Sequence, residues 1–329
     1  MHDAAAKVAA LRGRIIDLDH RKVLIACIRG SAQEADLTKP PNCQGYGRIR
    51  HFRRHRHGAW PCDPLPMDPA CKALGLPRQD VMTAEVFQCA GCNLRCWYCF
   101  VPPEVTAGDD RFAAWFSAEE LVDLYAQECA PPSIIDLSGG NPELVPEWIL
   151  WMMDALQRRE LDSRVYLWSD DSLTGEVAAD SAWREEVDAI SKYRNYGRVG
   201  CFKGYSEDSF EFNTGVDGAF FEKQFQAMTS LIKTGMDIYA YATFTTPSVC
   251  RLDDDIRRFV DRLQAIHRNL PLRTVPLEIV AFSPTKLRLN PGRRLAMQYQ
   301  HEVAGRWAEE LAVRYAPEEL TQNIADVAV

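Results

Sequence analysis

Residues 92–99 of this chain read Cys92-Asn93-Leu94-Arg95-Cys96-Trp97-Tyr98-Cys99. The three cysteines have a C-x3-C-x2-C spacing and lie in a short loop that follows a predicted strand. Iron–sulfur clusters are commonly held by four cysteine thiolates. A loop of this length can wrap three thiolates around one side of a cluster, which leaves one iron open to a ligand from outside the protein.

A zinc site is the other interpretation of these cysteines. Cys89 lies three residues before Cys92, and structural zinc sites often use four cysteines with C-x2-C pairs. The predicted second strand, however, ends in Ser138-Gly139-Gly140-Asn141-Pro142. Glycines allow the backbone to approach a bound molecule closely, which a zinc knuckle does not require. The sequence after the loop therefore favours a site for a larger ligand.

The composition is that of a globular protein without a strong bias toward nucleic acid. The 329 residues are 47% hydrophobic and 26% charged, with a net charge of −8. The number of cysteines, 11, is odd, and we find neither a secretory pattern nor an apolar run near the ~20 residues of a membrane span. We therefore expect reduced thiols, a cytoplasmic location and no membrane or nucleic-acid partner.

From residue 80 onward the hydrophobic pattern alternates between strands and helices. Strands are predicted at 80–88, 133–138, 164–168, 198–203, 236–245 and 274–282, each followed by a helix with apolar residues at helical spacing. The first helix begins at Ser117, where Glu120 completes a capping box. Six β–α units predict a parallel sheet with helices outside, and they are too few for an eight-stranded barrel. We expect an α/β fold, a partial (β/α)6 TIM-like barrel with ligands at the carboxyl ends of its strands.

Residues 1–79 have a different character. Helix is expected at 4–11 and a short strand or helical turn at 23–28, but residues 39–77 are dense in proline, which blocks long helices. We expect an irregular, Pro-, Cys- and Arg-rich N-terminal lobe that wraps a barrel domain of residues 80–329. Its basic run at 48–57 is either a solvated surface or a site for an anionic ligand.

The spare cysteines leave a second cluster open as a hypothesis. Cys43, Cys62 and Cys71 lie in the lobe, and Cys89 precedes the cysteine loop. Four cysteines are enough for an auxiliary iron–sulfur cluster. Their irregular spacings lack a C-x2-C pair, so buried or idle thiols are the alternative.

Together the cysteine loop and the Gly-Gly turn resemble the radical S-adenosylmethionine (SAM) superfamily. In that superfamily a Gly-Gly-Glu motif at the end of the second strand binds the amino group of SAM. Asn141 stands in place of the acid here, and its oxygen can still accept a hydrogen bond from an ammonium, without the charge. The resemblance implies a [4Fe-4S] cluster on Cys92, Cys96 and Cys99, and contacts to SAM from Ser138, Gly139, Gly140 and Asn141.

Within the superfamily, the barrel is most similar to the pyruvate formate-lyase activating enzyme group. Residues 201–215 resemble a stretch in which a strand ends in Asp-x-Lys and a Thr-Gly pair follows. Lys203 matches the lysine that reaches the carboxylate end of SAM, and Cys201 replaces the acid. The resemblance also implies Tyr98 near the adenine, with Ser169 and Asp170 contacting the ribose or the amino-acid part of SAM.

The implied activity is reductive cleavage of SAM to a 5′-deoxyadenosyl radical, which abstracts hydrogen from a substrate. That substrate is either a polypeptide, as for a glycyl-radical activase, or a small molecule of a biosynthetic pathway. Such an oxidoreductase needs a reductant such as flavodoxin or ferredoxin as a partner. No catalytic residue is assigned from the sequence. A non-catalytic iron–sulfur or zinc protein is the alternative of another class.

Overall fold

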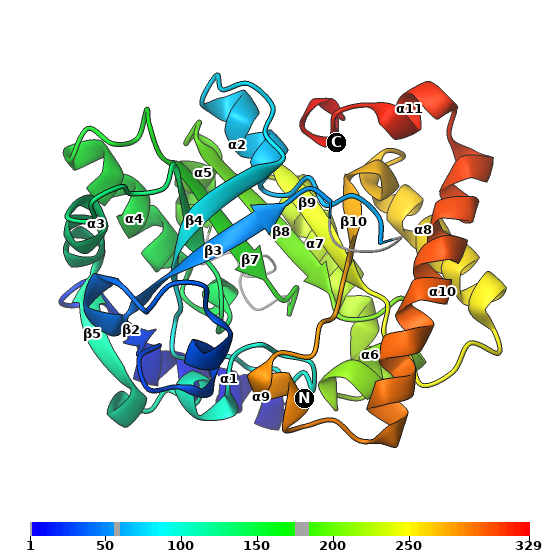
Figure 1. The fold of residues 1–329 in the computed structure, drawn as a ribbon, viewed down its shortest axis with the longest axis horizontal. Coiled ribbons are helices and arrows are strands. Elements are labelled where there is room, and N and C mark those ends of the chain that lie inside the picture. Colours follow the sequence, from blue (N-terminus) through cyan, green and yellow to red (C-terminus); the bar gives the residue numbers. More distant parts are fainter. Residues whose placement is uncertain (1, 56–59, 175–183) are drawn as a thin grey trace.

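A seven-stranded sheet in the order β10-β9-β8-β7-β6-β4-β3 forms the centre of the fold (Figure 1). The computed structural model describes residues 2–55, 60–174 and 184–329. The strands are β3 (Gly47–Arg53), β4 (Val81–Phe87), β6 (Ile134–Leu137), β7 (Tyr166–Asp171), β8 (Tyr196–Phe202), β9 (Ile238–Thr243) and β10 (Thr274–Leu277). Neighbours from β4 to β10 are parallel and follow the order of the chain, whereas β3 pairs antiparallel with β4. The predicted α/β partial barrel is confirmed.

Helices follow the parallel strands and cover the outer face of the sheet (Figure 1). They are α3 (Ala118–Ala126), α4 (Pro146–Arg158), α5 (Arg184–Ser191), α6 (Glu207–Thr214), α7 (Phe221–Ile232), α8 (Leu252–Ile266) and α10 (Pro291–Arg314). The predicted capping box of α3 is confirmed: Ser117 accepts from the Glu120 N–H at 3.2 Å, and Glu120 accepts from the Ser117 N–H at 2.7 Å. The helix predicted at 182–193 lies partly outside the described residues.

Alternate residues along each strand point into two different hydrophobic cores. On β7, Leu167 packs with residues of the covering helices, whereas Tyr166 and Trp168 belong to a second core that contains no residue of those helices. Tyr239 and Tyr241 of β9 also belong to this second core. The face of the sheet turned away from the helices therefore lines the interior of the partial barrel.

The N-terminal lobe contributes regular structure to two sheets. The helix expected at 4–11 is α1 (His2–Ile15), and the segment 23–28 overlaps β2 (Lys22–Ala26). β2 lies between β1 (Ile16–Asp17) and β5 (Ala113–Ser117) in a separate three-stranded sheet. The sequence did not predict β3 or α2 (Met67–Ala73). β3 escaped prediction because two of its buried or half-buried side chains, Arg48 and Arg50, are charged and do not produce an apolar alternation.

Trp60 and Asp63, in the proline-dense segment of the lobe, contact the β9–β10 edge of the sheet. The indole N–H of Trp60 donates to the carbonyl of Pro276 in β10 at 3.3 Å. The hydroxyl of Tyr241 in β9 donates to the carboxylate of Asp63 at 3.1 Å. The lobe thus contacts β9 and β10 as well as β4. A boundary between two domains at residue 79 stays a prediction.

Two of the predicted strands are shorter in the structure than in the sequence pattern. The strand predicted at 274–282 ends as β10 at Leu277, and the one predicted at 236–245 spans only β9. Beyond β10, the Ile279 N–H donates to the side chain of Gln300 in α10 at 2.9 Å instead of to a neighbouring strand. The chain leaves the sheet there because a side chain satisfies its backbone donor.

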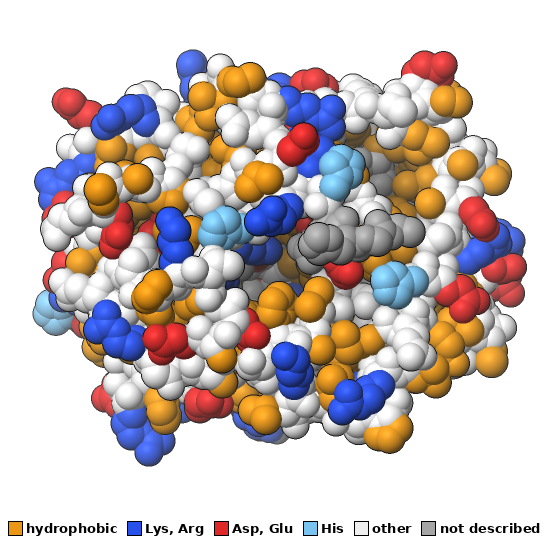
Figure 2. All heavy atoms as spheres, in the orientation of Figure 1, with side chains coloured by type: hydrophobic (Ala, Val, Ile, Leu, Met, Phe, Trp, Pro, Cys, Tyr) orange, Lys and Arg blue, Asp and Glu red, His pale blue; other side chains and the backbone are white. Residues whose placement is uncertain are grey.

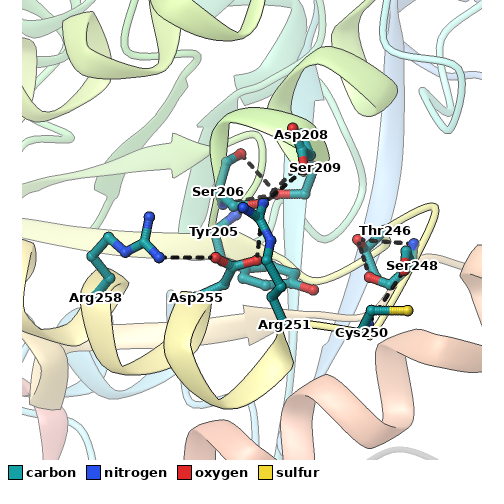
Figure 3. Close-up of polar contacts among 10 residues, drawn as sticks. All are labelled: Tyr205, Ser206, Asp208, Ser209, Thr246, Ser248, Cys250, Arg251, Asp255 and Arg258. Atoms are coloured by element: carbon teal, nitrogen blue, oxygen red, sulfur yellow. Dashed lines mark hydrogen bonds and ion pairs between the residues drawn. The ribbon is translucent and has the colours of Figure 1, made fainter.

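Polar contacts fasten the loops that follow β8 and β9 to each other (Figure 3). Arg251, just before α8, forms ion pairs with Asp208 of α6 at 2.8 Å and with Asp255 of α8 at 3.8 Å. Arg251 and Asp208 are exposed, so each such pair contributes at most about 1 kcal/mol. None of the helices in the described ranges is long and apolar enough to cross a membrane.

Candidate functional site

Most of the predicted site residues follow consecutive strands of the barrel. The cysteine loop follows β4, Ser138 to Asn141 follow β6, Asp170 lies near the end of β7, and Lys203 follows β8. Because β4, β6, β7 and β8 are parallel neighbours, their carboxyl ends meet at one edge of the sheet. The fold therefore brings these segments to one mouth.

The three cysteines of the loop are electrostatic neighbours. Burial raises the pKa of the Cys92 thiol well above its ordinary value, and the charges of Cys96 and Cys99 raise it further. Cys96 is buried, and Cys92 and Cys99 are half-buried. Three thiols this close do not ionise readily by themselves. A bound cation at this point would favour their thiolate forms.

The donor set fits an iron–sulfur cluster. In the part of the chain that the structure describes, no three His, Cys, Asp or Glu side chains form a group that could hold a single metal ion. The thiolates of a [4Fe-4S] cluster bind separate irons, so they need not converge on one point. Cys92, Cys96 and Cys99 are soft thiol ligands on one short loop, as a cluster with three protein ligands requires.

Lys203 places a positive charge beside the cysteine loop. Its side chain is half-buried at the end of β8. Burial by itself lowers the pKa of Lys203, but the neighbouring thiols, Cys201 first and then Cys96 and Cys92, outweigh it and raise the pKa above the ordinary value. Lys203 is therefore positively charged and lies beside the thiols of the loop. A ligand bound to a cluster on these thiols would meet this charge.

A pair of side chains, Trp97 of the loop and Asn213 of α6, joins the cysteine loop to α6. Trp97 donates from its backbone N–H to the carbonyl of Asn213 and from its indole N–H to the Asn213 side chain, both at 3.1 Å. Asn213 in turn accepts from Thr245 at 2.7 Å. Asn213 lies in α6 and directly precedes the Thr-Gly pair noted in the sequence, yet nothing in the sequence pattern indicated its role.

A second pair of side chains holds the loop from the segment after β10. Thr285, in α9 (Ser283–Lys286), donates to the carbonyl of Tyr98 at 3.1 Å. Arg288 donates to the carbonyl of Cys96 at 3.3 Å and also to that of Cys99. Sequence reasoning missed both residues, because contacts to backbone carbonyls leave no residue pattern. The loop is thus fixed from both sides of the mouth.

The Gly-Gly turn lies directly against the cysteine loop. Gly139 and Gly140 have φ of +93° and +68°. A Cβ on Gly140 would lie 2.1 Å from the carbonyl oxygen of Cys89. Gly140 is therefore required for the two backbones to pack at this distance, and a Cβ on Gly139 would meet the side chain of Gln88 at 2.8 Å.

Asn141 joins the turn to the cysteine loop. Its backbone N–H donates to the carbonyl of Gly91 at 2.7 Å, and its side-chain amide donates to Asn93 at 2.9 Å. Its side-chain oxygen accepts from the Ser172 N–H at 3.3 Å, and the residue is fully buried. The structure thus shows a positioning role for Asn141, and its contact to the amino group of SAM stays a prediction.

Ser138 and Asp170 meet inside the barrel. The Ser138 hydroxyl donates to the Asp170 carboxylate at 2.6 Å, and the indole of Trp168 donates to the same carboxylate at 2.8 Å. Arg50 of β3 lies 3.4 Å from Asp170 and 3.0 Å from Asp136 of β6. Burial first, and then Asp170, raise the pKa of Asp136 to about 7. This polar group lies on the interior face of the strands.

Ser169 lies apart from this group. It is adjacent to Asp170 in β7, so its side chain is on the opposite face of the sheet. It is fully buried there, and its hydroxyl lies 2.7 Å from that of Tyr196, which belongs to the core beneath the helices. The structure does not bring Ser169 together with the other predicted site residues.

Tyr98 extends from the cysteine loop to the end of β9. Its hydroxyl lies 3.2 Å from that of Thr243, the last residue of that strand. Its ring is half-buried, and burial raises the pKa of its phenol, with a smaller effect of the same sign from Cys96. Tyr98 thus lies across the mouth, and its packing against an adenine ring stays a prediction.

The structure does not bring together the four cysteines considered for a second cluster. The Cys89 thiol contacts the carbonyl of Gly91 at 3.5 Å, at the carboxyl end of β4. The Cys71 thiol contacts the sulfur of Met82 at 3.7 Å, near the opposite end of β4. At 3.3 Å per residue the two ends of this strand are roughly 20 Å apart. Cys43 contacts Glu128, and Cys62 is exposed.

The basic run of the lobe divides into inward and outward residues. Arg48 and Arg50 face the barrel interior, Arg54 is buried in an ion pair with Asp68, and Arg53 is exposed. Lys, Arg and His side chains gather beside a hollow near the middle of the face that Figure 2 shows. The run is therefore not simply a solvated surface.

No protein-family model and no curated protein matches the sequence. Among solved structures, SuiB of Streptococcus suis bound to the precursor peptide SuiA is similar over 54% of this chain, with a TM-score of 0.36 and 16% identity. The protein anSMEcpe with bound AdoMet is similar over 58% (TM-score 0.40, 14% identity). The radical SAM methyltransferase TsrM of Kitasatospora setae, with cobalamin and a [4Fe-4S] cluster, is similar over 59% (TM-score 0.40, 14% identity).

These similarities are partial in both directions. The matched region covers 35% of SuiB, 48% of anSMEcpe and 37% of TsrM. The chain thus corresponds to less than half the length of each. What this chain does is therefore inferred from its own residues.

Proposed function

We propose that this protein is a radical SAM enzyme. One observation carries the proposal: the C-x3-C-x2-C loop lies at the mouth of a partial barrel, against the Gly139-Gly140 turn and beside the fixed charge of Lys203. Cys92, Cys96 and Cys99 would hold a [4Fe-4S] cluster. When bound, that cluster supplies one electron at a time and an open iron for the amino-acid part of SAM.

The residues around the loop support binding of SAM. Lys203 provides a cation for the carboxylate of SAM, and Tyr98 provides an aromatic ring over the mouth. Asn141 fixes the Gly-Gly turn against the loop, so that backbone atoms of the turn are available for the amino group. Trp97 and Arg288 hold the loop in place from its two sides.

The proposed reaction uses one external electron to break the bond between C5′ and sulfur in SAM. Methionine leaves, and the 5′-deoxyadenosyl radical takes a hydrogen atom from the substrate. The electron comes from a small reductant protein such as flavodoxin or ferredoxin. The similarity of residues 201–215 to the pyruvate formate-lyase activating enzyme group supports a polypeptide substrate, as for a glycyl-radical activase.

Anaerobic reconstitution with iron and sulfide tests the proposal. The protein is expected to turn brown, to bind about four irons per chain, and to release 5′-deoxyadenosine from SAM after reduction. Cys96→Ala is expected to abolish all three properties, whereas Cys129→Ala, which removes an exposed cysteine outside the loop, leaves them unchanged. A colourless wild-type protein that holds one zinc tightly would overturn the proposal in favour of the zinc alternative.

A further inference from the structure

Arg48 is a buried arginine with unused hydrogen-bond donors. Its side chain is only 7% exposed. Its Nε–H donates to the side chain of Gln88 at 3.3 Å, and its guanidinium carbon lies 5.0 Å from the centre of the Phe100 ring. Within the described ranges, its two terminal nitrogens form neither a hydrogen bond nor an ion pair. A buried guanidinium normally has a partner for each of its nitrogens.

The guanidinium of Arg48 belongs to the interior face of the barrel. Arg48, Arg50 and Phe52 alternate along β3, so their side chains lie on one side of the sheet. Arg50 pairs with Asp136 and Asp170 on the interior face, and Phe52 packs in the interior core. Arg48 is the member of this row nearest the mouth, because it pairs in register with Val86 near the carboxyl end of β4.

The two acids in this part of the interior pair with Arg50 and not with Arg48. Arg48 and Arg50 are positive, Asp170 is negative, and Asp136 has a pKa of about 7 because it is buried beside Asp170. Burial and the charge of Arg50 lower the pKa of Arg48 to about 10, which still leaves it charged at neutral pH. Both carboxylates lie against Arg50, Asp136 at 3.0 Å and Asp170 at 3.4 Å. Within the described residues neither forms an ion pair with Arg48, whose terminal nitrogens are therefore available to an anion.

We propose that Arg48 binds a carboxylate of the substrate inside the barrel. This inference rests on the proposed function, since it names the chemistry by which that site holds its substrate. The terminal nitrogens of a guanidinium form a planar fork that matches the two oxygens of a carboxylate. The Nε2 of Gln88 is buried and forms no hydrogen bond within the described residues, so it is a further donor beside Arg48.

Arg48 is distinct from the cation expected to meet SAM. Lys203 is the side chain whose charge interacts with the three cysteines, whereas the acids that act on Arg48 are Asp136, Asp170 and Glu85. Phe100 connects the two regions, because it directly follows Cys99 and its ring lies under the guanidinium of Arg48. The centres of the Phe100 and Phe282 rings are 5.0 Å apart. A carboxylate on Arg48 therefore lies next to the cysteine loop without occupying the place of SAM.

The test measures binding of acetate, acetamide and inorganic phosphate to the full-length reconstituted protein at constant ionic strength. The readout is the shift of the thermal unfolding midpoint across a titration. We compare wild type with Arg48→Met and with Arg53→Met, which removes an exposed arginine of the same strand. Acetate is expected to bind wild type and Arg53→Met equally, and Arg48→Met at least fivefold more weakly. Acetamide is expected to bind none of them.

Three results would overturn the inference. One is equal acetate affinity of wild type and Arg48→Met. A second is phosphate binding through Arg48 more tightly than acetate, which would assign the site to a phosphate. The third is a tenfold loss of SAM affinity in Arg48→Met, which would assign the residue to the SAM carboxylate; we expect a change of less than twofold.

A conservative variant and a separate assay keep the outcomes distinct. Arg48→Lys retains the charge but not the planar fork, and it is expected to weaken acetate binding at least twofold. If Arg48→Met does not fold, undiminished acetate binding by Arg48→Lys overturns the inference. Release of 5′-deoxyadenosine by wild type without substrate reports on the proposed function alone. A protein that cleaves SAM but binds acetate independently of Arg48 would refute only this inference.

Discussion

Individual side chains at the mouth have roles that their neighbours determine. Lys203 and Asn141 both follow parallel strands and both match positions of the radical SAM pattern. Lys203 places its ammonium charge beside the thiols, whereas Asn141 uses its amide to join two loops. The same resemblance thus leads to a ligand-binding charge at one position and to a positioning residue at the other.

Replacing Lys203 tests the first of these roles. Lys203→Met removes the charge and keeps the length of the side chain, so we expect SAM to bind about tenfold more weakly, equal to ~1.4 kcal/mol. Equilibrium dialysis of the reconstituted protein measures this. Lys233→Met, at an exposed lysine, is the matched control and should bind SAM as wild type does. Equal SAM affinity in the two variants would rule out a role for Lys203 in binding the carboxylate.

At the scale of elements, the turn after β6 and the loop after β4 form one unit. The backbone of the turn packs so closely on Cys89 and Gly91 that no side chain fits at Gly140. Hydrogen bonds from Asn141 join the same two segments. The turn therefore supports the geometry of the cysteine loop independently of any contact to SAM.

Two glycine variants separate this close contact from backbone strain. Gly140 and Gly215 have nearly the same positive φ, +68° and +70°, but a Cβ on Gly215 would meet no atom within 4 Å. Gly215→Ala should cost about 1 kcal/mol through strain alone. Gly140→Ala must also displace the Cys89 backbone, so we expect a loss of ~3 kcal/mol or more in the free energy of unfolding, together with lower iron retention. Urea unfolding measures the difference, and equal losses in both variants would contradict the packing argument.

At the scale of the whole molecule, buried acids in the barrel make stability depend on pH. Glu85 of β4 is fully buried and accepts from Asn42 at 2.5 Å. Burial is the main cause that raises its pKa, from 4.5 to about 7. Between these values the folded protein holds the proton more tightly than the unfolded chain does. This contribution to stability is therefore present below about pH 4.5 and is lost as the pH rises to about 7.

Replacement of Glu85 by its neutral isostere should flatten this dependence. We expect Glu85→Gln to be close to wild type in stability at pH 5 and more stable at pH 8, by on the order of 2 kcal/mol. Unfolding in urea at both values of pH measures the change. The exposed Glu104→Gln serves as control and should follow the wild-type curve. A Glu85→Gln variant that loses stability equally at both pH values would refute the assignment.

Much of the architecture follows from short-range patterns. The six strands and their helices were predictable because apolar residues recur with period 2 or 3.6, and the capping box of α3 needed only Ser117 and Glu120. β3 was not predictable in this way, since its interior side chains include two arginines, of which Arg50 finds its partners in β6 and β7. The contact of Arg50 with Asp136 joins residues more than 80 apart in the chain.

The sequence by itself determined which residues supply the chemistry: three thiols at fixed spacing in one loop, a Gly-Gly turn and a lysine after successive strands. Local spacing carries that information because these groups lie close together along the chain or at repeated strand ends. Only the tertiary structure decided which side chains face the barrel. It turned Ser169 away from the mouth, used Asn141 to join two loops, and buried Arg48 on the interior face of β3. Those outcomes depend on the register and pairing of distant strands, which place the cysteine loop among partners that the sequence does not indicate.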